Sequence, residues 1–538
     1  MKQIFDKIHP RIMMLISGLL LGTTLIFADI GILAYIFLIP LAIALYKRAD
    51  GGNYKVRMAY LDGFVFFMGL DIVGFHWITY FYPLDFAGLS NVESLVVILL
   101  GWIGLSLLQS VFSALVFVII SRFIKTEIYK RYPLLLAPFA AAMITVNEWT
   151  QTFTWAGVPW SRVGISQTSM PIMMQTASLF GSYFLTFVIV LFNFLVAYAI
   201  LKADKRRFVA ILALAVFCGN FILSATLYFI PSHNEDRAIK VASVQGNIES
   251  KNISSMAELA NIIDVHRKQT RKAVEDGAEL VIWAEGTMPI NIHDYIGIDG
   301  GYKKLSDVVS DLAKELGVTI VLGSYVDFEG GYNNSISAFY ADGSTNINAY
   351  AKRRPVPFGE YLPMSDVIMA IIPLLAEINI FSEVTPGETA TVFDADISGD
   401  PIKVGTLICF DSIYERIGID SARAGAEMFI IPSNDAWFYD SRALYMHACQ
   451  NTLRAVEQGK YVVNCGNSGI TSIVNAKGET LVTMPIFTEG YVIDTVYASS
   501  GRTLYSYIGN LFVYVCIAAA IVPFGFELYF ALKKRRIG

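Results

Sequence analysis

Hydrophobic and polar residues follow two different patterns along this chain of 538 residues. Long, nearly unbroken apolar runs fill residues 11–231 and 506–532, whereas residues 238–497 carry the shorter apolar runs and frequent charges of a water-soluble domain. Because the hydrocarbon core of a bilayer is about 30 Å thick, roughly 20 apolar residues are needed to cross it as a helix. This criterion predicts about eight spans, near residues 11–27, 30–46, 58–82, 92–121, 132–149, 174–200, 208–230 and 506–532.

The predicted spans divide the chain into three parts. We expect a polytopic α-helical membrane domain with seven spans in residues 1–237, a soluble domain in 238–497, and a last span with a basic tail in 498–538. The hydrophobic fraction of 54% and the charged fraction of 16% agree with this division, since both lie outside the usual range of soluble proteins. The basic residues form short clusters beside the spans, which gives no support to a nucleic-acid-binding function.

These basic clusters also predict how the chain is oriented. By the positive-inside rule, loops rich in Lys and Arg face the cytoplasm. Both termini are therefore expected in the cytoplasm, and seven preceding spans place the soluble domain on the extracytoplasmic side. The intervening loops are nearly free of basic residues, with Arg162 as the exception. The clusters are Lys2, Lys7 and Arg11; Lys47, Arg48, Lys55 and Arg57; Arg122, Lys125, Lys130 and Arg131; Lys202, Lys205, Arg206 and Arg207; and Lys533, Lys534, Arg535 and Arg536.

In the soluble domain, short apolar runs alternate with amphipathic segments. This alternation is typical of an α/β layered domain in which helices cover a sheet, and it leaves open whether the sheet is parallel or mixed. The predicted helices are 254–276, 302–316, 413–425 and 441–459. The predicted strands are 239–248, 278–285, 318–326, 335–341, 346–352, 403–410, 428–433, 461–467, 469–475 and 479–485.

Three reactive side chains stand at or near the ends of predicted strands, where an α/β fold presents catalytic groups. Glu285 follows the run LVIW, and an apolar setting would raise its pKa toward the working range of a general base. Cys409 precedes a predicted helix, whose start would favour the reactive thiolate. Lys352 could stabilise an oxyanion. Together these residues predict acyl transfer through a thioester.

Each of these residues also has a structural interpretation, because a cysteine in an apolar strand is usually a small core residue. The soluble domain holds three cysteines, Cys409, Cys449 and Cys465. An odd number leaves at least one thiol without an intramolecular partner, and a disulfide between Cys449 and Cys465 stays open. The local sequence around the reactive residues is therefore needed to distinguish a catalytic role from a structural one.

The soluble domain resembles the nitrilase, or carbon–nitrogen hydrolase, superfamily over essentially all of residues 238–497. Three motifs carry the resemblance: WAEG around Glu285, KRRPVPFGEYLP beginning with Lys352, and ICFDSIYE around Cys409. Members of that superfamily use a Glu-Lys-Cys triad in this chain order. The resemblance implies a sandwich with α-β-β-α layers and assigns Glu285, Lys352 and Cys409 as the catalytic residues.

The chain as a whole is similar to the apolipoprotein N-acyltransferase family, the integral-membrane branch of that superfamily. The motifs VPFGEYLP (356–363) and SNDAWF (433–438) are typical of this branch. In the membrane region, GFVFFMGLDIVGFHWI (63–78) is similar to the family's third span. Nearly all of segment 147–197 is similar to the connection between its fifth and sixth spans.

This second resemblance implies a function. The family N-acylates the N-terminal diacylglyceryl-cysteine of apolipoproteins, the last step of bacterial lipoprotein maturation, through a thioester on the catalytic cysteine and with ping-pong kinetics. The implied partners are a membrane phospholipid as acyl donor, a diacylated apolipoprotein as acceptor, and the lipid bilayer. The resemblance also implies a monomer in the bacterial cytoplasmic (inner) membrane, a periplasmic catalytic domain, and neither a metal nor an organic cofactor.

Other residues of the motifs are expected to support the triad. Glu360 could orient Lys352 or relay a proton. Asp411 stands where the family usually has a glutamate and could keep its role with a shorter reach, and Phe410 stands where a tyrosine is common. Ala284 departs from the usual Trp-Pro-Glu run. These departures leave the triad whole and bear on substrate preference.

Three tryptophans are candidate substrate contacts: Trp437 in SNDAWF, and Trp155 and Trp160 in the connection before the sixth span. For the last two, an interfacial aromatic belt is an equally open interpretation. The apolar segment 364–381 is predicted to be a lipid-contacting lid, because it is longer than a normal core strand and adjoins the lysine motif.

Two other functions remain open. The first is a membrane-tethered hydrolase of the amidase or nitrilase type, with the same triad and with water as the second acceptor. The second is a transporter or sensor that carries an inactive nitrilase-like domain. The intact triad and the similarity of the membrane region favour the acyltransferase.

Overall fold

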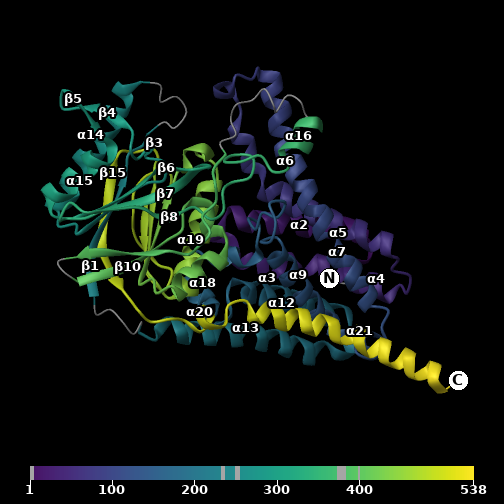
Figure 1. Cartoon of the computed structure of the whole chain (residues 1–538). Coiled ribbons are helices and arrows are strands. Elements are labelled where there is room, and N and C mark those ends of the chain that lie inside the picture. The colour runs from purple at the N-terminus through teal and green to yellow at the C-terminus, as the bar shows by residue number, and fades with distance from the viewer. Residues whose placement is uncertain (1–4, 232–236, 249–254, 372–382, 398–399, 538) are drawn as a thin grey trace. The chain divides into compact units, whose positions relative to one another are not determined.

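The structure, a computed structural model, describes residues 5–231, 237–248, 255–371, 383–397 and 400–537. The chain forms two compact units (Figure 1). We call the first the helical unit, and it comprises residues 1–79, 97–230 and 508–538. The second, the α/β unit, comprises residues 80–96 and 231–507.

The helical unit is built from the apolar runs. Five helical stretches of the described chain are long and apolar enough to cross a membrane: Ala28–Asp50, Asn91–Phe123, Ser182–Leu201, Ala203–Phe229 and Leu511–Phe530. The helices are α2 (Pro10–Ile26), α3 (Ala34–Phe37), α4 (Ile39–Asp50), α5 (Val56–Gly74), α6 (Asn91–Ser113), α7 (Leu115–Phe123), α8 (Glu127–Arg131), α9 (Leu136–Thr150), α10 (Pro171–Met174), α11 (Ala177–Phe180), α12 (Ser182–Leu201), α13 (Arg206–Phe229) and α21 (Leu511–Ile537). A region with several apolar helices is confirmed, and the number of eight spans stays a prediction.

The predicted third span, 58–82, is longer than the helix that the structure contains. Helix α5 ends at Gly74, and a 3₁₀ helix, η2 (His76–Phe81), follows it. Residues 80–96 then belong to the α/β unit, where the ring of Phe81 stacks on that of Phe438 at 6.5 Å between centroids and 12° between planes. The apolar pattern could not reveal this end, because aromatic residues suit a membrane helix and a protein interface equally well.

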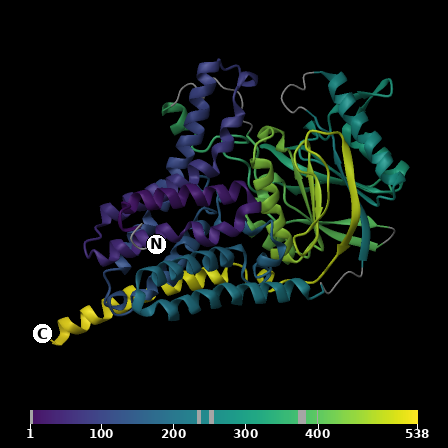
Figure 2. The ribbon, with the colours of Figure 1, turned by 180° about the vertical axis from the view of Figure 1, so that it is seen from behind.

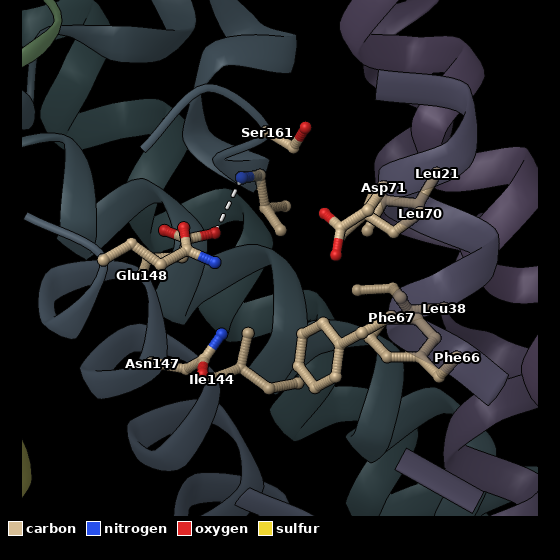
Figure 3. Close-up of a pocket in the computed structure, with 12 residues that line it drawn as sticks. Leu21, Leu38, Phe66, Phe67, Leu70, Asp71, Ile144, Asn147, Glu148 and Ser161 are labelled. Carbon is tan, nitrogen blue, oxygen red and sulfur yellow. Dashed lines mark hydrogen bonds between the residues drawn. The ribbon is translucent and has the colours of Figure 1, made fainter. Parts of the chain in front are cut away.

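Polar side chains line a small pocket inside the helical unit (Figure 3). Glu148 on α9 is buried and accepts hydrogen bonds from the Val163 N–H (2.7 Å) and the Thr186 hydroxyl (2.8 Å). The Thr186 oxygen in turn accepts the Gly164 N–H (3.0 Å). A buried carboxylate in a membrane region needs such partners. These bonds tie the connection that follows α9 to helix α12.

We predict that Glu148→Ala lowers the thermal unfolding midpoint of the detergent-solubilised protein. The change leaves the buried Val163 N–H and Thr186 hydroxyl without their acceptor, which costs about 1–3 kcal/mol for each unsatisfied group. Glu148→Gln keeps one acceptor oxygen and is expected to lose less. Glu127→Ala, at an exposed carboxylate, is the control. Equal midpoints for Glu148→Ala and the control would contradict the assignment.

The α/β unit contains two mixed sheets. The first has the strand order β15-β1-β2-β6-β7-β8, with β3 also paired to β6, and the second has the order β14-β13-β12-β11-β10-β9. The strands are β1 (Arg237–Gln245), β2 (Leu280–Trp283), β3 (Met288–Asn291), β4 (Tyr295–Ile298), β5 (Gly301–Lys304), β6 (Thr319–Phe328), β7 (Gly331–Phe339), β8 (Thr345–Ala351), β9 (Val392–Ile397), β10 (Asp400–Thr406), β11 (Met428–Ser433), β12 (Val462–Gly466), β13 (Ser472–Val474), β14 (Thr480–Thr483) and β15 (Gly490–Ala498).

Parallel pairs occupy the middle of each sheet and antiparallel pairs its edges. In the first sheet β1, β2 and β6 run parallel, and in the second β10, β11 and β12 do. The sequence pattern missed β3, β4, β5, β9 and β15. The last of these pairs with β1 in register from Arg237 opposite Ala498 to Gln245 opposite Gly490. The domain therefore extends past the predicted end at residue 497.

Helices cover the outer faces of both sheets, and the inner faces share one core (Figures 1 and 2). Helices α14 (Met256–Glu275) and α15 (Leu305–Leu316) pack on the first sheet, and α18 (Glu415–Arg423) and α19 (Ala443–Gln458) lie against the second. The shorter helices are α16 (Ser365–Ile371) and α20 (Leu504–Ile508). The core between the sheets includes Ile282 from the first and Ile430 from the second. The predicted α-β-β-α sandwich is confirmed.

Candidate active site

The three predicted catalytic residues leave the sheets at strand ends. Glu285 comes two residues after β2, Lys352 directly after β8, and Cys409 three residues after β10. Trp283, two residues before Glu285, is buried in the core that the helices cover, while Ala284 is buried in the core between the sheets. Ala284, which departs from the usual Trp-Pro-Glu run, therefore fills the core between the sheets.

Lys352 holds two carboxylates together. Its Nζ lies 2.7 Å from Glu285 Oε1 and 2.8 Å from Glu360 Oε2, and its side chain is 1% exposed. The Asn334 amide on β7 donates to both carboxylates, at 2.7 Å each. The Asn434 N–H donates to Glu285 Oε2 (2.9 Å). Glu360 therefore contacts Lys352 directly, and its role, either orienting Lys352 or relaying a proton, stays a prediction. No motif in the sequence pointed to Asn334.

The charges of this cluster are set by burial and by ion pairs. Burial alone would raise the pKa of Glu285, but the Lys352 ammonium and the Asn434 N–H hold the pKa of this carboxyl below its usual range. Burial acts to lower the pKa of Lys352, but Glu285 and Glu360 raise it well above its usual range. Glu285 is therefore a carboxylate and Lys352 an ammonium. The expected upward shift for Glu285 is wrong, because an ion pair outweighs the apolar setting.

The thiol of Cys409 lies in the field of these charges. Burial, and then the negative charge of Glu285, raise the pKa of Cys409 well above its usual range, against the opposing effect of Lys352. The expected thiolate at a helix start is wrong for this state of the protein. The 3₁₀ helix η7 (Cys409–Ile413) begins at Cys409 itself, and α18 starts only at Glu415. The thiol is therefore neutral and stands beside an ionised base.

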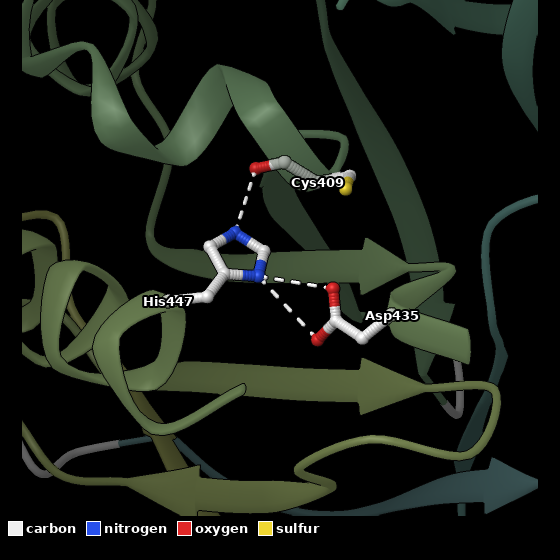
Figure 4. Close-up of side chains that lie close together, drawn as sticks. All are labelled: Cys409, Asp435 and His447. Carbon is white, nitrogen blue, oxygen red and sulfur yellow. Dashed lines mark hydrogen bonds and ion pairs between the residues drawn. The ribbon is translucent and has the colours of Figure 1, made fainter. Parts of the chain in front are cut away.

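A second cluster, formed by Asp435 and His447, lies close to Cys409 (Figure 4). Nε2 of His447 is 3.1 Å from the Cys409 carbonyl oxygen and 3.0 Å from Ser412 Oγ. Its Nδ1 is 3.1 Å from the nearer oxygen of Asp435. The Cys409 Sγ, an Asp435 oxygen and a His447 ring nitrogen lie within 4.8 Å of one another, close enough to share a metal ion. Both ring nitrogens, however, are already engaged in hydrogen bonds.

Asp411 links the lysine motif to the nucleophile motif. Its buried carboxyl accepts the Tyr350 hydroxyl (2.7 Å) and the backbone N–H groups of Arg354 (2.8 Å) and Arg353 (3.2 Å), which follow Lys352 directly. Burial raises the pKa of Asp411 to about 6, although these donors oppose the shift. The Asp411 carboxyl thus connects the segment after Lys352 to the segment that begins at Cys409, and its supporting role stays a prediction.

The remaining predicted residues are divided between the two units, Phe410 and Trp437 in the α/β unit and Trp155 and Trp160 in the helical unit. Phe410 is partly exposed and packs edge-on against Tyr414, with 5.5 Å between ring centroids. Trp437 is 41% exposed, and Trp155 is partly exposed. Trp160 is 2% exposed and packs against Trp77 in the helical unit, so a contact with substrate would require rearrangement.

Two other expectations concern cysteines and the lid. None of the five cysteines, all of which lie in the described part of the chain, forms a disulfide, so the open question of a disulfide between Cys449 and Cys465 is answered negatively. Cys465 is buried, and its thiol donates to the carbonyl oxygens of Val244 (3.4 Å) and Ile282 (3.3 Å) between the two sheets. Of the predicted lid, 364–381, residues 372–381 lie outside the described part of the chain.

Comparison with known proteins adds two family matches and several full-length relatives. Residues 240–504 match the family model for carbon-nitrogen hydrolases, and residues 17–195 match the model for the N-terminal domain of apolipoprotein N-acyltransferase. A protein of Geobacter metallireducens named apolipoprotein N-acyltransferase is 27% identical over 532 residues, 96% of this chain and 95% of that protein. A Synechocystis protein of the same name is 23% identical over 488 residues, 86% of this chain and 89% of its own length. The crystal structure of Saccharomyces cerevisiae Nit3, a nitrilase-superfamily member, is 19% identical and covers 51% of this chain and 93% of its own, with a TM-score of 0.36.

We predict that Asp411→Asn lowers the thermal unfolding midpoint of the protein. An asparagine has one acceptor oxygen where the carboxylate has two. Either the Arg353 and Arg354 N–H groups at Oδ1 or the Ile408 N–H at Oδ2 therefore loses its acceptor, at about 1–3 kcal/mol for each unsatisfied group. Asp394→Asn is the matched control, because that carboxylate is 58% exposed and its ion pair with Lys403 is expected to contribute about 0–1 kcal/mol. If both variants unfold at the native midpoint, Asp411 is not a structural brace.

Proposed function

The chain belongs to the apolipoprotein N-acyltransferase family and is an acyltransferase of lipoprotein biosynthesis. On that premise we propose that it moves a fatty acyl chain from a membrane phospholipid to the α-amino group of an N-terminal diacylglyceryl-cysteine. The observation that carries the proposal is the buried Lys352, which binds Glu285 and Glu360 beside the thiol of Cys409. The cluster supplies a base, a cation and a nucleophile.

In the first half-reaction, Cys409 is acylated. The Glu285 carboxylate accepts the thiol proton as Sγ attacks the ester carbonyl carbon of the phospholipid. The Lys352 ammonium stabilises the oxyanion that forms on the carbonyl oxygen. The C–O bond of the ester then breaks, and the departing glycerol oxygen takes the proton from Glu285. A lysophospholipid leaves, and the acyl chain stays on Cys409 as a thioester.

In the second half-reaction, the thioester is resolved by an amine. The α-amino nitrogen of the diacylglyceryl-cysteine attacks the thioester carbonyl, and Glu285 accepts a proton from that nitrogen. The C–S bond breaks, the Cys409 sulfur takes the proton back, and the product is an amide. Since the donor product leaves before the acceptor reacts, this scheme predicts ping-pong kinetics.

The apolar helices account for where such a reaction takes place. Both proposed substrates are lipids, and withdrawing an acyl chain from a bilayer costs about 0.8 kcal/mol for each CH₂ group exposed to water. An active site at the membrane surface avoids this cost. We therefore propose a monomeric inner-membrane protein with cytoplasmic termini and the α/β unit on the periplasmic side, in agreement with its basic loops. Trp437 and Trp155 remain proposed substrate contacts.

Intact-protein mass spectrometry of the enzyme purified from membranes tests the proposal. We expect a fatty-acyl mass increment that neutral hydroxylamine removes, since hydroxylamine cleaves thioesters. Cys409→Ala should lack the increment, and Cys449→Ala, which changes another cysteine of the same unit, should keep it.

Adding a synthetic diacylated lipopeptide then distinguishes transferase from hydrolase. The transferase discharges its acyl chain onto the peptide amine, and the increment is stable in water until the peptide arrives. Rapid loss of the increment in water alone would indicate a membrane-tethered hydrolase. An enzyme that acquires no increment, even with added phospholipid vesicles, would contradict the proposed first half-reaction.

A further inference from the structure

The nucleophile occupies a strained backbone conformation. Cys409 has φ = +48°, in the left-handed region that residues with a side chain rarely adopt. Holding a residue other than glycine there costs of the order of 1–3 kcal/mol and persists only when the surroundings enforce it. The groups that bind the backbone at Cys409 therefore decide where its sulfur points.

Two side chains bind that backbone from opposite ends of the turn. On one side, the Asp411 carboxyl accepts the Ile408 N–H at 3.3 Å. On the other, His447 Nε2 lies 3.1 Å from the Cys409 carbonyl oxygen. A carbonyl oxygen can only accept, so Nε2 must carry the proton and donate it. His447 is thus bonded to the peptide backbone of the nucleophile instead of serving as a base for its thiol.

The orientation of the imidazole is itself enforced. His447 lies on α19, is 2% exposed, and places Nδ1 at 3.1 Å and 3.4 Å from the two oxygens of Asp435. The Asp435 carboxylate accepts, so Nδ1 donates as well, and the ring is an imidazolium. Burial opposes this charge, but Asp435 raises the pKa of His447 above its usual value. Glu285 acts in the same direction.

The loop that carries Asp435 also holds the general base. Asn434 and Asp435 follow β11 directly, and the Asn434 N–H binds Glu285 Oε2 at 2.9 Å. The dipeptide Asn434–Asp435 therefore contacts Glu285 through the backbone N–H of Asn434. It also contacts Cys409 indirectly, because the Asp435 side chain binds His447. Gly469 packs closely against this loop: a Cβ atom added at Gly469 would lie 2.6 Å from the Asp435 Cβ. This close packing restricts the position of Asp435.

We infer that His447 and Asp435 are positioning residues that hold Cys409 in its strained conformation, so that the sulfur is aligned with the base Glu285 for attack. The inference rests on the proposed function in one respect, since it takes Cys409 as the nucleophile. The inference predicts that His447 affects the rate at which Cys409 is acylated and does not affect the binding of phospholipid. The loop Asn434–Asp435 sets the relative placement of base and nucleophile.

Two substitutions at His447 separate the hydrogen bond from the volume of the ring. His447→Phe keeps a planar ring and removes both donors, while His447→Gln places an amide donor where Nε2 stood. Misplacement of a reacting group by about 1 Å can cost a factor of about 100 in rate. We expect His447→Phe to slow thioester formation in single turnovers by about that factor, with the phospholipid concentration at half-maximal rate nearly unchanged. His447→Gln is expected to recover most of the rate.

Equal losses in both variants would overturn the inference, because a space-filling role does not distinguish the amide from the aromatic ring. A loss confined to the half-maximal phospholipid concentration would also overturn it, since it would place His447 in substrate binding. Thermal unfolding midpoints of both variants identify any general loss of folding.

A crystal structure of His447→Phe tests the inference without any substrate. We expect Cys409 to leave the positive-φ region in that variant and to keep it in His447→Gln. If Cys409 retains its φ in His447→Phe, the positioning role is wrong. This outcome is independent of the proposed function, which fails instead if the native enzyme forms no thioester.

Discussion

One buried ammonium compensates a buried carboxylate and a partly buried one, and the rest of the candidate site depends on this arrangement. A charge removed from water is tolerated only when it is paired and fully hydrogen-bonded. Lys352 pairs with Glu285 and Glu360, and the Asn334 amide bridges the same two carboxylates. The strand ends that carry these residues are therefore held together by electrostatics as well as by the core between the sheets.

This arrangement also divides the chemical roles. The pairing keeps Glu285 ionised and able to accept a proton, while burial and the Glu285 charge keep the Cys409 thiol protonated. In the proposed mechanism, the reactive thiolate therefore forms only as the proton moves to Glu285 during attack. The second buried cation, the imidazolium of His447, balances Asp435 and binds the backbone of Cys409. In the proposed mechanism, Lys352 stabilises the negative charges of the reaction, and His447 holds the backbone of Cys409 in position.

The sequence predicted the layers of the α/β unit, because short apolar runs and amphipathic helices are local signals. The assignment of Glu285, Lys352 and Cys409 as catalytic residues rests on local motifs and stays a prediction. The sequence did not predict Asn334 or the role of His447, since both act through contacts between residues distant in the chain. The direction of the pKa shift of Glu285 was wrong for the same reason: local apolarity is visible in a sequence, and an ion pair with Lys352 is not. Helix α5 ends before the predicted span does. The aromatic residues at this point are compatible with a membrane helix and with a protein interface, so the sequence pattern does not mark the end of the helix.

The most direct test of the central claim is the pH dependence of Cys409 alkylation by iodoacetamide, followed by peptide mass spectrometry, in the native protein and in Glu285→Gln. The account predicts that removing the Glu285 charge, while Lys352 stays, lowers the midpoint of the alkylation profile by roughly one to three pH units. The variant should thus alkylate faster near neutral pH, although it has lost its base. Glu315→Gln, at a carboxylate that is 55% exposed, is the control. A midpoint that stays the same or rises in Glu285→Gln would contradict the claim that the buried ion pair controls the thiol.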